Sequence, residues 1–328
     1  MRIFSGIQPT GSKHLGNYIG AIRQYVEGQD RGDPAIYCNV DLHAITVAWD
    51  PATLRQSVYD TTGILIAAGL DPERCILFRQ SDVREHTELT WYLSALTAQG
   101  DLNRMTQFKE KSAKQRELVS AGLFFYPVLQ AADVLAYKAQ EVPVGEDQRQ
   151  HVELMREIAR RFNERFGQIL VEPGHRIPEV GARIMDLQEP SNKMSTTGGN
   201  ETGTVLVLDD PDTVTKKIKS AVTDSGSDVK RGDGKEGIAN LIQILAVARG
   251  TTEDEIEGEF EGSGYGDFKG AVAQAVVEFL APVRERYEEL RPDEAALEGA
   301  LASGAEKARA IASETLAEVR SAMGIGPA

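Results

Sequence analysis

The chain has 328 residues, of which 41% are apolar and 6% aromatic, enough for two globular domains with substantial cores. The net charge of −14 argues against a general nucleic-acid coat, which needs a basic surface, but allows a defined RNA contact on a local basic patch. No apolar run reaches the length of a membrane span, and two cysteines cannot build a cysteine-rich metal site. Because Cys38 and Cys75 lie in apolar runs, we expect buried free thiols, no disulfide and a reducing cytoplasm. The chain starts directly on a strand, so we expect no signal peptide.

The first part of the chain alternates predicted strands and helices. A strand at residues 3–4 enters a loop rich in Gly and Pro, and an amphipathic helix begins around residues 14–17. Buried strands are predicted at 35–41 and 75–80, with a helix over 53–70 between them. This alternation predicts an α/β, Rossmann-like parallel sheet whose ligands lie beyond the carboxyl ends of the strands. His43, residues 81–82 and the loop after Phe4 fall there.

The rhythm of strands stops at about residue 84. We expect helices at 88–99 and 151–166, an apolar stretch over 122–137 that Pro127 interrupts, and a returning strand at 142–144. From residue 210 onward the pattern is helical, with a bend near Pro282 and a long Ala-rich helix over 301–323. The sequence therefore predicts a catalytic domain over 1–200, with a helical insertion over about 84–170, and an all-helical C-terminal domain over 201–328.

Two polar loops suit phosphate chemistry. At residues 5–17 the strand, Gly-rich loop and helix start direct backbone N–H groups and the positive end of a helix at the loop, and Gly16 allows close approach. Alone this pattern is weak, because many α/β proteins begin this way and His14 could simply cap or pack. The second loop, over 189–203, carries Lys193, for which a solvated surface lysine is the ordinary alternative.

These two loops carry a family resemblance. HLGN at 14–17 and KMSTT at 193–197 resemble the two ATP motifs of class I aminoacyl-tRNA synthetases, usually written HIGH and KMSKS. SGIQPTG, DLHAITV, RMTQFKEKSA, GEDQRQH, GARIM, KKIKSAVTD and GAEKARAIA extend the resemblance over the whole chain to the bacterial-type tryptophanyl-tRNA synthetases. The resemblance implies an aminoacyl-tRNA ligase that forms tryptophanyl-adenylate and pyrophosphate from L-tryptophan and ATP with Mg²⁺. It then loads the 3′ end of tRNA(Trp).

The resemblance also implies the site residues. Catalytic roles fall to His14, Lys111 and Lys193. The implied ATP-binding residues are Gln8, Pro9, Thr10, Gly16, Asn17, Gly145, Glu146, Asp147, Ile184, Lys193, Met194, Ser195, Thr196 and Thr197. The implied tryptophan-binding residues are Phe4, His43, Tyr126, Asp133, Val142, Val144 and Gln148. No metal ligand is implied, and neither is a protein-bound zinc or iron–sulfur cluster.

Asp133 is the expected acceptor for the indole N–H. A carboxylate in an apolar helical run needs a buried partner, which favours this role over an aspartate on the surface of the helix. A site built around that hydrogen bond rejects phenylalanine or tyrosine by about 10⁴. For His43, the alternative to a wall of the indole site is a satisfied core histidine.

One position departs from the family motif. Thr196 stands where KMSKS has its second lysine, and a threonine hydroxyl brings no charge. Either Lys193, Lys111 and the Mg²⁺ of ATP carry the charge stabilisation, or activation is slow. The resemblance further implies a homodimer joined through the helical insertion, a C-terminal domain that reads the CCA anticodon, and no membrane partner.

Two other functions remain open on the sequence. A small-molecule adenylyltransferase with an HxGH-type loop is disfavoured by residues 210–328, which such enzymes usually lack. A paralogue deficient in adenylation, acting as a tryptophan or RNA sensor, is supported by Thr196 and Thr197. Tryptophan-dependent ATP–pyrophosphate exchange separates these functions from the ligase.

Overall fold

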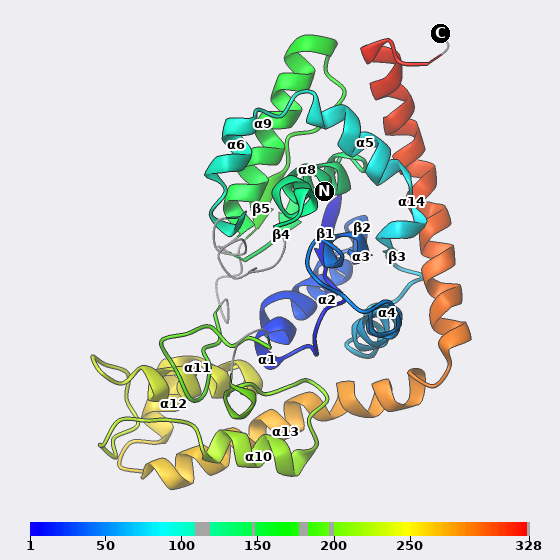
Figure 1. The fold of residues 1–328 in the computed structure, drawn as a ribbon. Coiled ribbons are helices and arrows are strands. Elements are labelled where there is room, and N and C mark those ends of the chain that lie inside the picture. Colours follow the sequence, from blue (N-terminus) through cyan, green and yellow to red (C-terminus); the bar gives the residue numbers. More distant parts are fainter. Residues whose placement is uncertain (109–118, 146–147, 177–182, 197–199, 327–328) are drawn as a thin grey trace. The chain divides into compact units, whose positions relative to one another are not determined.

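A computed structural model describes residues 1–108, 119–145, 148–176, 183–196 and 200–326 (Figure 1). The chain folds into two compact units. The first comprises Met1–Thr10, Tyr25–Ile177 and Asp293–Ala328, and the second comprises Gly11–Gln24 and Pro178–Pro292. The division of the chain into functional domains at 1–200 and 201–328 stays a prediction, because compactness alone assigns no role to a segment.

The first unit is built on the predicted parallel sheet. In spatial order its five strands are β3 (Ile76–Arg79), β2 (Ala35–Asn39), β1 (Ile3–Ile7), β4 (Glu141–Pro143) and β5 (Gly174–Arg176). All neighbouring pairs are parallel. The strand β5 was not predicted, because its three residues are polar or exposed and carry no apolar pattern. The chain order reverses between β1 and β4, and ligands of open α/β sheets bind beyond the strand ends at such a switch point.

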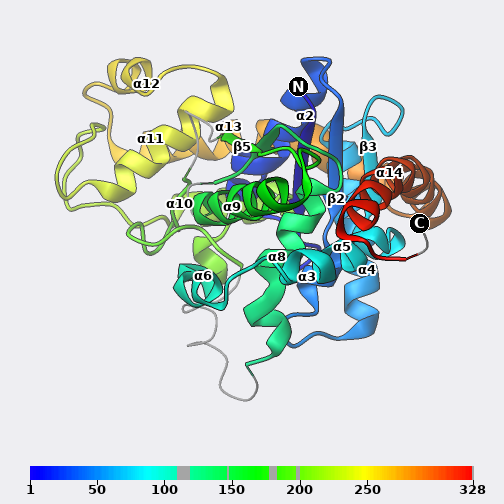
Figure 2. The same ribbon diagram turned by 90° about the horizontal axis from the view of Figure 1, so that it is seen from above.

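Helices cover this sheet and fill the insertion between β3 and β4. They are α2 (Arg23–Asp30), α3 (Asp41–Ala44), α4 (Pro51–Ala67), α5 (Glu85–Ser94), α6 (Gln99–Arg104), α8 (Ala121–Leu135), α9 (Arg149–Phe166) and α14 (Glu294–Met323), with a 3₁₀ turn η2 at Gln80–Asp82. The helix α8 packs against both α5 and α9 (Figure 2). The predicted interruption at Pro127 is wrong: α8 runs through it, because a proline removes a single helical hydrogen bond that tertiary packing offsets.

The C-terminal helix α14 lies along the outer strand β3 (Figure 1). Gly304 makes this approach possible, because a Cβ atom there would lie 1.8 Å from the backbone oxygen of Leu77. Ala305, Ala308 and Ala312 follow on the same helix and are buried in the core of the first unit. A stripe of small residues thus brings the helix onto an edge strand and shields that edge from pairing with other chains.

The second unit is helical. Its elements are α1 (Leu15–Asn17), the π-helical segment η1 (Tyr18–Ile22), the 3₁₀ turn η4 (Glu201–Gly203), α10 (Pro211–Lys219), α11 (Glu236–Arg249), α12 (Glu253–Glu259) and α13 (Tyr265–Leu290). The long helix α13 packs against α10 and α11 (Figure 1). Ile218, Leu241 and Phe268 are fully buried among these helices. The prediction of helices over residues 201–328 is confirmed, and the last of them, α14, belongs to the first unit.

The two cysteines agree with the prediction. Cys38 and Cys75 are free and buried, as predicted. In the part of the chain that the structure describes, no helix has the length and apolar character needed to cross a membrane. Over the same residues, no group of three or more His, Cys, Asp or Glu side chains is placed to hold a metal ion.

Candidate active site

The HLGN segment forms a capped helix start in the second unit. The Asn17 backbone N–H donates to His14 Nδ1 at 3.3 Å, and the His14 N–H donates to Asn17 Oδ1 at 3.2 Å. The Leu15 N–H donates to the oxygen of Val205 at 2.8 Å, which ties the segment to the chain that follows KMSTT. Because Nδ1 accepts, the proton of the neutral imidazole lies on Nε2, where it is available to a phosphate oxygen.

His14 is neutral at pH 7. Burial, and then the positive charges of Lys193 and Lys13, lower its pKa to about 4. The imidazole is therefore a hydrogen-bond donor without charge. Positive charge at this site comes from the lysines, and the influence of Lys193 on His14 connects the two motifs electrostatically.

The KMSTT loop begins on a backbone bridge between Lys193 and Met185. The Met194 N–H donates to the oxygen of Ile184 at 3.0 Å, and both of these side chains are 1% exposed. Asn240 of α11 fastens the bridge: its Oδ1 accepts from the Met185 N–H and its Nδ2 donates to the Met185 oxygen, both at 2.9 Å. The sequence did not single out Asn240, since an asparagine within an apolar helix carries no motif.

The two ATP motifs lie side by side in the second unit. A Cβ atom on Gly11 would lie 2.9 Å from Thr196 Oγ1, and one on Gly16 would lie 3.5 Å from Ile184 Cβ. The Ser195 backbone oxygen accepts from Thr204 Oγ1 at 3.1 Å. Thr196 is exposed and contributes a hydroxyl where the family motif has a cation.

Asp133 lies at the centre of a buried polar cluster in the first unit. Its side chain is 2% exposed and accepts from His43 Nε2 at 2.8 Å, from His86 Nδ1 at 2.5 Å and from Gln80 Nε2 at 2.7 Å. Burial on its own raises the pKa of Asp133, but the hydrogen bonds from His43 and His86 and their charges outweigh it and hold that pKa far below its usual range. The carboxyl group is thus ionised, and the alternative of an aspartate on the helix surface is wrong.

His43 is buried and bonded to Asp133, so it is a satisfied histidine inside the predicted site. Its ring lies 6.0 Å from that of Tyr126, whose hydroxyl lies 2.9 Å from His151 Nε2. His86 and Gln80 were missed by sequence reasoning. A histidine at a helix start carries no motif, whereas Gln80 directly precedes residues 81–82, which we expected at the ligand edge of the sheet.

The remaining predicted tryptophan residues surround the switch point of the sheet. Phe4 of β1 is 2% exposed and stacks on Tyr137 at 5.4 Å, and Val142 of β4 is 3% exposed. The Val144 N–H donates to the oxygen of Arg176 at 3.0 Å, and Gln148 Oε1 accepts from Gln130 Nε2 at 3.5 Å. Gln8, Pro9, Thr10 and Gly145 follow β1 and β4 directly.

The predicted residues therefore divide between the two units. The tryptophan set, Gln8, Pro9, Thr10 and Gly145 belong to the first, and His14, Gly16, Asn17, Ile184, Lys193, Met194, Ser195 and Thr196 belong to the second. Lys111, Glu146, Asp147 and Thr197 lie outside the described residues. Their roles stay predictions.

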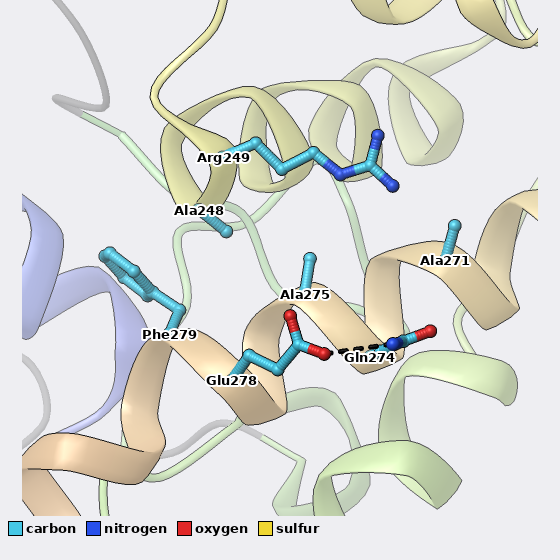
Figure 3. A pocket seen from close by; sticks show the side chains of 7 residues that line it. All are labelled: Ala248, Arg249, Ala271, Gln274, Ala275, Glu278 and Phe279. Atoms are coloured by element: carbon cyan, nitrogen blue, oxygen red, sulfur yellow. Dashed lines mark hydrogen bonds between the residues drawn. The ribbon is translucent and has the colours of Figure 1, made fainter.

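A separate cavity of about 580 Å³ lies in the second unit (Figure 3). It is lined by Ala248, Arg249, Ala271, Gln274, Ala275, Glu278 and Phe279. Gln274 donates to Glu278 at 2.9 Å and Arg249 donates to Glu259 at 2.8 Å, so these polar groups already have protein partners. The cavity contains none of the predicted site residues.

Comparison with known proteins agrees with the two motifs. Residues 1–281 match the family described as tRNA synthetases class I (W and Y). A tryptophan–tRNA ligase 2 of Streptomyces avermitilis is 51% identical over 330 residues, covering 100% of this chain and 98% of the relative.

Solved structures extend this similarity to the fold. The tryptophanyl-tRNA synthetase of Mycoplasma pneumoniae superposes with a TM-score of 0.93 at 34% identity, covering 99% of this chain and 98% of that one. The Campylobacter jejuni tryptophanyl-tRNA synthetase in complex with ADP and tryptophan superposes with a TM-score of 0.84 at 35% identity, covering 99% and 100%.

Proposed function

Because the chain belongs to the family of class I tRNA synthetases for tryptophan and tyrosine, we propose that it activates L-tryptophan with ATP and transfers it to tRNA(Trp). The relative that matches the whole chain supports tryptophan as the amino acid, and the buried, ionised Asp133 supports a side chain that carries a hydrogen-bond donor. A carboxylate accepts hydrogen bonds only, so it selects a ligand that presents an N–H or O–H donor at that position. The indole of tryptophan presents one, and phenylalanine presents none.

The reaction needs alignment and charge stabilisation. The tryptophan carboxylate attacks the α-phosphorus of ATP, a P–O bond to the β-phosphate breaks, and Mg²⁺-bound pyrophosphate leaves. The protein aligns two anions and stabilises the charge that grows on the leaving group. His14 donates its Nε2–H to a phosphate oxygen, and Lys193 supplies positive charge from the facing loop. The Mg²⁺ enters with ATP as part of the substrate.

The missing cation at Thr196 shifts this work to the remaining groups. Thr196 lies beside the backbone of Gly11, where its hydroxyl brings no positive charge. Lys193, Lys111 and the Mg²⁺ then stabilise the leaving pyrophosphate. The full-length similarity to a tryptophan–tRNA ligase, and the positive charge of Lys193 near His14, support a ligase with a modest activation rate over an inactive paralogue.

Tryptophan-dependent ATP–pyrophosphate exchange tests the proposal. The wild-type chain is expected to exchange with tryptophan and to be inert with phenylalanine. Asp133→Ala is expected to lose discrimination between these two amino acids by about 10⁴ while ATP binding survives. If the wild type exchanges and Asp133→Ala still discriminates between the two amino acids, another group binds the indole N–H. Absence of exchange, with tryptophan still bound, would favour the sensor.

A homodimer and a tRNA contact complete the proposed function. Ile45, Val47, Trp49 and Val119 are large apolar residues that are 37–53% exposed. The Ser120 hydroxyl donates to the oxygen of Thr46 at 3.0 Å, which joins the two segments that carry them. An exposed apolar surface of this kind supports a subunit contact. Trp49→Glu is expected to shift the sedimentation coefficient from dimer to monomer, and an unchanged coefficient would exclude this surface.

For tRNA, the exposed lysines of α10 support a backbone contact in the C-terminal helices. Lys216 and Lys219 are exposed, whereas Lys217 is 8% exposed and pairs with Asp209 at 2.7 Å. Lys216→Ala with Lys219→Ala is expected to raise the KM for tRNA(Trp) and to leave pyrophosphate exchange unchanged. An unchanged KM for tRNA would remove α10 from the RNA surface. Ligation to tRNA implies a cytoplasmic location.

A further inference from the structure

Gln80 and His86 both donate hydrogen bonds to the same oxygen of the Asp133 carboxylate. Gln80 Nε2 and His86 Nδ1 lie 2.7 and 2.5 Å from Oδ1, whereas His43 Nε2 lies 2.8 Å from Oδ2. Gln80 and His86 are both 0% exposed. A carboxylate has about four acceptor positions, two on each oxygen. Among the residues that the structure describes, Oδ1 is therefore filled and Oδ2 keeps one position.

Two contacts set the proton position on His86. The ionised carboxylate of Asp133 only accepts, so the proton of His86 lies on Nδ1. Tyr137 Oη lies 2.6 Å from His86 Nε2, and burial raises the pKa of Tyr137 well above its ordinary value. Tyr137 therefore keeps its proton, and its hydroxyl shares a hydrogen bond with His86 Nε2. The imidazole has a single orientation that satisfies both neighbours.

The amide of Gln80 is oriented in the same way. The Leu42 backbone N–H donates to Gln80 Oε1 at 3.0 Å, which leaves Nε2 to face Asp133. Gln80 lies in η2 and His86 in the first turn of α5, so one short segment after β3 supplies both donors. Asp133 comes from α8, and the carboxylate is held between two independent elements.

We propose that Gln80 and His86 are positioning residues that hold the Asp133 carboxylate so that the remaining acceptor position of Oδ2 faces the indole N–H of tryptophan. This inference rests on the proposed role of Asp133. Both residues act through Asp133 and do not contact the amino acid. A held acceptor discriminates strongly, because a ligand without the donor leaves a buried charge that cannot turn toward another partner.

The test compares tryptophan with its benzothiophene analogue, in which sulfur replaces the indole N–H. The ratio of kcat/KM for the two amino acids is measured by ATP–pyrophosphate exchange on the full chain. His86→Leu is expected to lower the ratio by about 10- to 100-fold, mainly through the KM for tryptophan. His86→Asn is expected to keep most of the wild-type ratio that His86→Leu loses, because the asparagine amide presents an N–H near the position of Nδ1.

Three outcomes separate the positioning role of Gln80 and His86 from the proposed indole-binding role of Asp133. A general structural role of His86 would lower kcat/KM for both amino acids equally and leave the ratio unchanged, which would overturn the proposal. If Asp133→Ala leaves the ratio at its wild-type value, the role of Asp133 itself fails. If Asp133→Ala abolishes the preference while His86→Leu and Gln80→Leu retain it, the positioning role alone fails.

A milder variant keeps the test decisive if His86→Leu does not fold. Tyr137→Phe keeps the ring that stacks on Phe4 and removes the hydroxyl that orients His86. The ratio is expected to fall severalfold in this variant. An unchanged ratio, in a variant that melts like the wild type, would count against the proposed chain of contacts.

Discussion

Gly304→Ala is expected to destabilise the protein, although alanine normally favours a helix over glycine. The new Cβ would lie 1.8 Å from the backbone oxygen of Leu77 and 3.2 Å from its backbone nitrogen. Neither atom is the end of a flexible side chain, so the backbone of α14 itself must move away from β3 to restore contact distance. Overpacking costs about 1–3 kcal/mol, and the clash of the new Cβ with a backbone that cannot rotate away places Gly304→Ala at the upper end, about 3 kcal/mol.

The same helix supplies the matched control. Gly299 also lies in α14, and a Cβ atom there would meet nothing within 4 Å. Gly299→Ala should therefore gain the helix-propensity difference alone, about 1 kcal/mol of added stability. The two substitutions are chemically identical, but their expected effects on stability are opposite in sign.

Urea unfolding followed by circular dichroism measures both variants against the wild type. We expect a lower urea midpoint for Gly304→Ala and an equal or higher one for Gly299→Ala. Equal stability of the two variants would refute the close packing of α14 on β3. The α14 interface would then contribute little to holding the edge strand.

Four further outcomes follow from the second unit. Asn240→Ala is expected to cost about 2 kcal/mol and to slow exchange, because the backbone N–H and oxygen of Met185, the bridge partner of Lys193, lose their hydrogen-bond partner. Asn192→Ala on the loop surface should cost under about 0.5 kcal/mol in the same urea assay. In an NMR titration of the folded protein His14 should protonate near pH 4, whereas its pKa in the unfolded chain is 6.5. Because the unfolded chain takes up the proton first, the free energy of unfolding should fall by about 3 kcal/mol as the pH drops from 6.5 to about 4. The variant His14→Asn should not show this loss. Lys193→Ala should slow exchange far more than it weakens tryptophan binding measured by calorimetry, and equal losses would contradict its role at the phosphates. Thr196→Lys should raise the exchange rate about tenfold, and an unchanged rate would show that charge at this position is not limiting.

Much of the fold followed from local pattern. Alternating apolar runs predicted the strands that became β1, β2, β3 and β4, because buried parallel strands read as continuous apolar segments. The three-residue β5 had no such pattern. Pro127 gave a local signal for a helix break, but the apolar faces of α8 are buried on both sides and packing overrides that signal.

The candidate site divides in the same way. HLGN, KMSTT and an isolated aspartate in an apolar helix are visible in the linear chain because each is a local departure from its surroundings. Asn240 carries no such mark, and its function depends on a loop that lies 55 residues away in sequence. Hydrogen bonds of this range come from the arrangement of elements.

The sequence by itself determined the family, the two ATP motifs, the parallel sheet and the burial of Asp133. These depend on residue type and short spacing, which the chain carries directly. Only the tertiary structure decided what surrounds that carboxylate: His86 lies 47 residues away in sequence and Gln80 lies 53. Which lone pairs of Asp133 are occupied, and which one is left for a ligand, depends on how β3, α5 and α8 pack together, and no local pattern encodes that geometry.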